Sequence, residues 1–130
     1  MAWTVDYDGE SGTIVTIYRG TSTVHDLREA TSAAIALGKT HDSWYFLTDA
    51  SEGSFHVAPI ALLNLPAKQY PAEGVDRGSR LALLPPAAAK DRDLARFYET
   101  VCLNRGWLVQ LFDDRDEARR WLLKDARPTP

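Results

Sequence analysis

The sequence predicts an α/β protein with a five-stranded mixed β-sheet, covered by about four helices in the order ββαβαβαβα. Three observations predict this class: a glycine-rich turn between two alternating segments, helix-opening capping motifs, and short apolar runs between the helical segments. The chain has 130 residues, of which 45% are hydrophobic. We therefore expect one domain over residues 1–125 and a frayed C-terminal tail over residues 126–130, which contains two prolines.

The first two strands are predicted by alternating apolar and polar side chains. Residues 3–7 alternate throughout, and residues 14–18 alternate apart from one extra apolar residue. Between them, Asp8 and Gly9 are followed by Gly12, and this is typical of a hairpin because glycine adopts positive φ without a Cβ clash. We expect an antiparallel pair of strands here.

A helix and a central strand are expected next. Thr23 and Asp26 have the spacing of a capping box, in which each side chain satisfies a free amide of the helix start. Apolar residues then recur at helical intervals, and Gly38 supplies a left-handed stop. The continuous apolar run at residues 44–48 is typical of a strand that is covered on both faces.

The second helix is predicted to be short. Pro59 suits its first turn, and Pro66 lacks an amide hydrogen and should end or kink it early. Residues 69–78 contain a proline and two glycines, so we expect a mobile surface loop there.

The remaining elements alternate strand and helix. Residues 81–84 are a short buried strand, an apolar stripe ending before Gly106 marks a helix, and residues 107–112 form the last strand. Asp114 and Glu117 form another capping box, which opens the closing helix. The predicted core includes Leu47, Leu83, Leu94, Phe97, Val101 and Trp121.

Composition excludes several classes of protein. Fifteen basic and eighteen acidic residues give a net charge of -3, which is opposite to the basic surface of a nucleic-acid binder. No apolar run approaches the length of a membrane span. The single cysteine, Cys102, cannot form an internal disulfide, and the first ten residues lack a signal-peptide pattern. We expect a cytoplasmic protein.

Three groups of letters at element ends carry a family resemblance. Thr-Val-His-Asp-Leu opens the first helix, Leu-Thr-Asp-Ala-Ser ends the third strand, and Phe-Asp precedes a closing Glu-Ala-Arg-Arg-Trp-Leu. Together with the element order, these resemble the SpoIIAA-like group of STAS domains, relatives of bacterial anti-sigma-factor antagonists. The resemblance implies a non-enzymatic fold that is used for protein contacts or for holding small apolar or nucleotide ligands.

One departure from that family concerns phosphorylation. The antagonists carry a phosphorylatable serine at the start of the second helix, in an Asp-Ser-Ser-Gly pattern. Aligning residues 49–51 with the family's Asp-x-Ser places Val-Ala-Pro-Ile, residues 57–60, over this pattern. No hydroxyl stands there, and Ser51 or Ser54 reaches the site only in a different loop register. Kinase-controlled partner switching is therefore in doubt for this chain.

A second class of function, a small hydrolase-like enzyme, rests on Asp49, Ser51 and His56. These three residues fall in the expected connection between a strand and a helix, where α/β sheets place ligand sites. A carboxylate, a hydroxyl and an imidazole are the parts of an activated nucleophile. However, no Gly-x-Ser-x-Gly elbow is present, and the alternative is that Asp49, Ser51, Ser54 and His56 satisfy loop amides or lie near the helix start.

Metal and cofactor motifs are not found in the sequence. The three histidines are spaced sixteen and fifteen residues apart, and neither His-x-x-x-His nor a Cys/His pair occurs. No Gly-x-Gly-x-x-Gly and no phosphate-binding loop occurs either. We expect no cofactor and no metal, and we expect Cys102 to be a small buried hydrophobic residue.

The second helix suggests a binding surface. Its apolar residues occupy both sides of the helix, more than one buried stripe can hide, unless the following loop folds back over them. We expect a non-catalytic, regulatory domain that binds a protein partner or a small apolar ligand. We expect either a homodimer or a monomer that carries an apolar ligand, with the segment 60–70 at the contact. The candidate binding residues are Asp49, Ser51, Ser54, His56, Ile60, Leu62, Leu63 and Tyr70.

Overall fold

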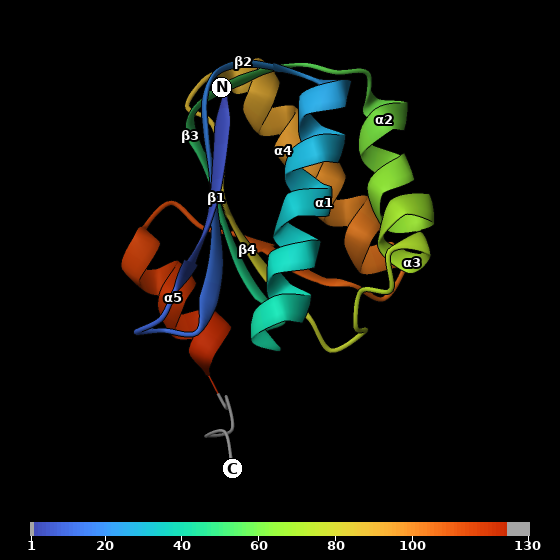
Figure 1. The fold of residues 1–130 in the computed structure, drawn as a ribbon. Coiled ribbons are helices and arrows are strands. Elements are labelled where there is room, and N and C mark those ends of the chain that lie inside the picture. The colour runs from blue at the N-terminus through green and yellow to red at the C-terminus, as the bar shows by residue number, and fades with distance from the viewer. Residues whose placement is uncertain (1, 125–130) are drawn as a thin grey trace.

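The computed structural model describes residues 2–124 and confirms the predicted fold class (Figure 1). The strands are β1 (Trp3–Asp8), β2 (Thr13–Thr23), β3 (Tyr45–His56), β4 (Arg80–Leu84) and β5 (Leu108–Leu111). The helices are α1 (Val24–His41), α2 (Pro59–Asn64), α3 (Tyr70–Ala72), α4 (Ala89–Asn104) and α5 (Arg115–Leu123), with a π-helical turn η1 (Leu65–Gln69) joining α2 to α3. The predicted tail, 126–130, lies outside the described residues.

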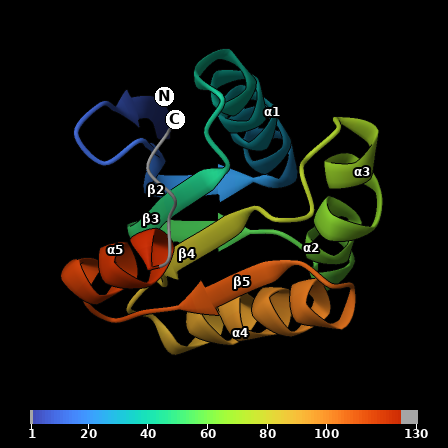
Figure 2. The ribbon, with the colours of Figure 1, turned by 90° about the horizontal axis from the view of Figure 1, so that it is seen from below.

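The five strands lie in sequence order, β1-β2-β3-β4-β5. The first pair is antiparallel, as the hairpin signal predicts, and the other three pairs are parallel. Because right-handed crossovers between neighbouring parallel strands all pass over one face, α1, the α2–α3 segment and α4 cover the same side of the sheet. Helix α5 covers the other side (Figures 1 and 2).

Strands β2 and β3 extend beyond the sheet that they share with β4. Pairing of β3 with β4 ends at Asp49 and Leu84, whereas pairing of β2 with β3 continues to Thr23 and His56. The register shifts between Ile17 and Arg19, where β3 holds one extra residue. Asp49, Ser51 and His56 therefore lie on β3, and the expected strand-to-helix connection that was to contain them is wrong. Residues 49–56 contain few apolar side chains, because one face of this part of β3 is exposed. The apolar run at residues 44–48 therefore marks only the first part of the strand.

The second helix does not end at Pro66. The segment α2–η1–α3 is continuous from residue 59 to residue 72, so the predicted loop begins later, after Ala72. Pro66 and Pro71 each lie in the first turn of a new helical segment, where a missing amide hydrogen costs no bond. In the π-turn, the amide of Tyr70 donates to the carbonyl of Leu65, five residues back.

Gly38 is not the helix stop that the sequence predicts. Helix α1 continues to His41, and Asp42 takes the left-handed conformation at φ 49°. Gly38 is instead a close-approach position, since a Cβ there would lie 2.7 Å from the carbonyl oxygen of Ser43.

The core has one part on each face of the sheet. Leu83 lies in the larger part, beneath α1, α2 and α4, and Leu47 lies in the part beneath α5. Leu94 and Trp121 are partly buried against these clusters. Phe97 is 38% exposed, so its predicted core position is wrong. The buried face of α4 is instead formed by Asp91, Ala95, Tyr98 and Cys102.

Candidate functional site

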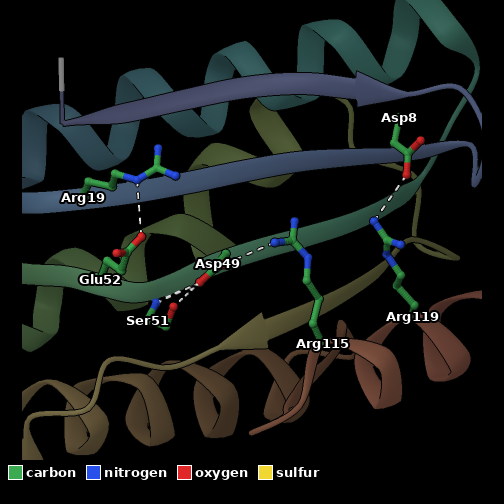
Figure 3. Close-up of polar contacts among 7 residues, drawn as sticks. All are labelled: Asp8, Arg19, Asp49, Ser51, Glu52, Arg115 and Arg119. Atoms are coloured by element: carbon green, nitrogen blue, oxygen red, sulfur yellow. Dashed lines mark hydrogen bonds and ion pairs between the residues drawn. The ribbon is translucent and has the colours of Figure 1, made fainter.

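The first candidate region lies on the face of the sheet that α5 covers. Asp49 Oδ1 accepts hydrogen bonds from the Ser51 amide at 3.0 Å and from the Ser51 hydroxyl at 2.6 Å. Its other oxygen, Oδ2, lies 3.6 Å from a guanidinium nitrogen of Arg115, at the start of α5. Figure 3 shows these contacts on one side of β3, together with the pairs Arg19–Glu52 and Arg119–Asp8.

A hollow of about 310 Å³ opens beside Asp49 and Ser51. Arg92 also lines it and pairs with Asp113 at 2.8 Å. Each arginine of the hollow therefore has a carboxylate partner, and the Ser51 hydroxyl donates to Asp49. Opposite charges that are already paired leave little net field for a charged substrate.

The structure brings Asp49 and Ser51 together but not His56. His56 lies five residues beyond Ser51 on the same strand, roughly 16 Å away at the rise of an extended chain. Its side chain is exposed, and its strand partner is Thr23. Ser54 Oγ lies 3.0 Å from Thr21 Oγ1 on the exposed ribbon. A serine nucleophile needs its base within hydrogen-bond reach, and this arrangement does not provide it.

Metal binding has no structural support in residues 2–124. No group of three or more histidine, cysteine, aspartate or glutamate side chains in this part of the chain converges as a ligand set. The expectation that the protein holds no cofactor remains a prediction.

The second candidate region is an apolar cavity on the opposite face of the sheet, beneath α1, α2 and α4. The cavity has a volume of about 100 Å³ and is lined mainly by aliphatic and aromatic side chains. A second apolar hollow of about 70 Å³ lies next to it and shares five of its lining residues. Of these two apolar hollows, the one of about 100 Å³ is called the larger hollow below. These shared residues are Tyr18, Thr31, Thr48, Tyr70 and Leu81.

Two of the predicted binding residues of the second helix line this cavity. Leu62 and Tyr70 are buried and face it, whereas Leu63 is half-buried and Ile60 is 60% exposed. The continuous helix explains the division, because residues three and four positions apart share one face.

Three tyrosines line the cavity, and Cys102 is buried in the same core cluster. The hydroxyls of Tyr70 and Tyr98 are hydrogen-bonded to each other. Burial raises the pKa of both phenols and of Tyr18, and it raises the pKa of the Cys102 thiol to about 12. All four groups are therefore neutral at physiological pH.

Asp91 is the acidic residue of this region. It lies in the first turn of α4, is 7% exposed, and lines the larger hollow. None of the ion pairs found among residues 2–124 includes its carboxylate. The sequence does contain a signal for this residue: it shares one helical face with Ala95, Tyr98 and Cys102, a polar residue on a face that is otherwise buried.

The architecture defines a class of small α/β domain, in which one antiparallel pair precedes a parallel sheet with three crossover segments on one face. Solved structures identify it as the SpoIIAA-like fold. The anti-sigma factor antagonist SpoIIAA in its unphosphorylated form is 18% identical, with a TM-score of 0.54 over 95% of this chain and 99% of that chain. An uncharacterized DUF3478-family protein with a SpoIIAA-like fold, from Shewanella loihica PV-4, is 16% identical, with a TM-score of 0.57 over 93% and 92%.

Comparisons with family models and with curated sequences found no match. Within residues 2–124, no helix is both long and apolar enough to cross a membrane.

Proposed function

We propose that this protein is a non-catalytic STAS-like domain that binds a small apolar ligand in the cavity beneath α1, α2 and α4. The observation that carries the proposal is the cavity itself, which is lined mostly by apolar side chains and holds neutral hydroxyls and one buried carboxylate. Ligand sites of globular proteins have this composition: a largely apolar hollow with a few polar groups.

The size of the cavity defines the class of ligand. A cavity of about 150 Å³ lined by leucine, isoleucine and phenylalanine is known to bind benzene in another protein. The larger hollow here, at about 100 Å³, is suited to a short alkyl chain, and the adjacent 70 Å³ extends the space available.

The position of the cavity in the fold also supports ligand binding. Leu83 lines it near the end of β4, and Ala50 lines it from β3, one residue beyond the last β3–β4 pair, at the carboxyl edge of β4 where open parallel sheets place ligands. Leu62 and Leu65 line it from α2 and η1. A ligand that contacts both the sheet and α2 would stabilise one position of that helix, and this links ligand binding to the outer surface of α2.

A protein partner is the second candidate function, and Ile60 favours it. This side chain is 60% exposed on α2, two residues from the cavity-lining Leu62. A regulatory protein or a second copy of the chain that covers Ile60 would contact the helix whose other face meets the ligand.

The non-catalytic part of the proposal rests on the geometry of β3. The Ser51 hydroxyl is hydrogen-bonded to Asp49, and His56 is the last residue of β3. The start of α2 also lacks a hydroxyl, since its cap residue is Ala58 and its first residue is Pro59. These positions support neither a hydrolase nor phosphorylation at the family's position.

Ala95→Leu tests the proposal by filling the cavity. Ala95 is 8% exposed and lines the larger hollow. Amide chemical shifts in nuclear magnetic resonance spectra report the binding of 1-butanol. We expect the parent protein to bind with shifts around the cavity, and Ala95→Leu to lose this binding while its melting temperature stays within a few degrees.

Ala89→Leu is the matched control, because Ala89 is exposed on the same helix. It should bind 1-butanol as the parent does. A parent protein without cavity shifts would contradict the proposal, and so would an Ala95→Leu variant that binds equally well.

A further inference from the structure

The geometry points to a cationic ligand: we infer that the cavity takes a short alkyl chain carrying an ammonium group, which pairs with the carboxylate of Asp91. This inference rests on the proposed function, since it assigns a chemical class to the ligand of the same cavity.

Asp91 is the charged residue among those that line the larger hollow. Its side chain is 7% exposed, and Leu62, Leu83 and Leu94 line the same space. The carboxylate therefore adds a negative charge to a hollow that is otherwise lined mainly by apolar side chains. A bound ammonium group would pair with this charge through charge-assisted hydrogen bonds.

No basic side chain of α4 supplies that cation. Arg92, the next residue along the chain, pairs with Asp113 and donates to the Pro86 carbonyl. Lys90 precedes Asp91 and is exposed. The carboxylate therefore has no counterion among residues 2–124, although two cationic residues flank it in the sequence.

The helix dipole explains why an acid is tolerated at this position but not which way it faces. Asp91 lies in the first turn of α4, where negative charge is favourable. A carboxylate on the outer face of α4 would gain the same interaction. Asp91 instead lines the apolar hollow, where a bound ligand can reach it.

The other polar groups fit an ammonium ligand. An ammonium has three N–H donors, and the carboxylate accepts from one or two of them. Tyr18, Thr31 and Thr48 also line the larger hollow, and each carries a hydroxyl oxygen that accepts hydrogen bonds. The alkyl chain would then lie against the leucines.

Three ligands of equal chain length test the inference: n-butylamine hydrochloride, 1-butanol and sodium butyrate, titrated at neutral pH. Dissociation constants come from amide chemical shifts around the cavity. We expect the parent protein to bind butylammonium at least about tenfold more tightly than 1-butanol, and butyrate more weakly than either. Asp91→Asn should remove the preference for the ammonium while it keeps the affinity for 1-butanol.

Asp93→Asn is the matched control, because it removes the same charge from an exposed position two residues away. It should keep the preference, so a general effect of net charge is distinguished from contact with Asp91. Equal binding of ammonium and alcohol by the parent protein would overturn this inference and leave the proposed function standing. If none of the three ligands binds, both fail. An Asp91→Asn variant that keeps the preference would also overturn the inference.

Discussion

At the residue scale, the chemistry of the chain is decided by which side of a strand or helix a side chain faces. Asp49, Ser51 and His56 are neighbours in sequence, but an extended strand separates the histidine from the other two. Asp91 lies in the first turn of α4, where acids are common, and its one local signal is the helical face that it shares with Ala95, Tyr98 and Cys102. That face does not reveal the hollow, because Leu62 of α2 also lines it.

Alkaline pH should destabilise the protein through its buried phenols and thiol. Burial raises the pKa of Cys102 from 9.0 to about 12 and raises those of Tyr70 and Tyr98 above 10.0. The unfolded chain therefore releases these protons at lower pH than the folded chain, so the free energy of unfolding falls as pH rises above about 9. Urea unfolding at pH 8 and pH 10.5 measures this decrease.

The Cys102→Ala variant separates the thiol from the tyrosines. It should lose part of the decrease in stability, because the tyrosines still titrate. A free energy of unfolding that is constant from pH 8 to pH 10.5 would contradict the assignment of these groups as buried and neutral.

At the element scale, the order and type of the elements could be predicted because each is marked by local periodicity or a cap. The capping box of Thr23 and Asp26 is present as expected, with the Asp26 amide donating to the threonine hydroxyl. Two features could not be predicted. The ribbon of β2 and β3 is polar on its exposed face, and the π-turn lets the chain continue through Pro66.

The π-turn is hydrogen-bonded to Trp107. The amide that would bond the Pro66 carbonyl at π spacing belongs to residue 71, a proline without an amide hydrogen. The indole N–H of Trp107 donates to this carbonyl instead, at 3.2 Å. The same ring makes an edge contact with Tyr70, with centroids 5.5 Å apart.

Trp107→Phe should therefore destabilise the protein by about 1–3 kcal/mol, because it leaves a buried carbonyl without a donor. Chemical denaturation measures this loss. Trp44→Phe is the control, since the Trp44 indole N–H has no acceptor among residues 2–124 and Trp44 is half-buried. An equal loss of stability in both variants would show that ring volume, rather than the hydrogen bond, stabilises the turn.

At the scale of the whole molecule, the fold could be predicted further than the site. The element order restricts the topology, because short right-handed connections allow few arrangements. The cavity is the space that remains between three helices and a sheet, and its walls come from side chains as far apart in sequence as Tyr18 and Tyr98. No sequence spacing encodes such a space, so the sequence marks Leu62 and Tyr70 only as members of an apolar segment.

Association of the whole molecule should depend on Ile60. We predict a homodimer with the outer face of α2 at the contact, since Ile60 is 60% exposed while Leu62 is 7% exposed and faces inward. Ile60→Glu should give a folded monomer, because the charge remains in water. Leu62→Glu should instead unfold the domain, because it places a carboxylate in the core.

Sedimentation equilibrium measures the mass of each species, and thermal unfolding measures its stability. A parent protein that sediments as a monomer would contradict the dimer, and a dimeric Ile60→Glu variant would move the contact to another surface, such as the edge strand β5 with its exposed Leu108.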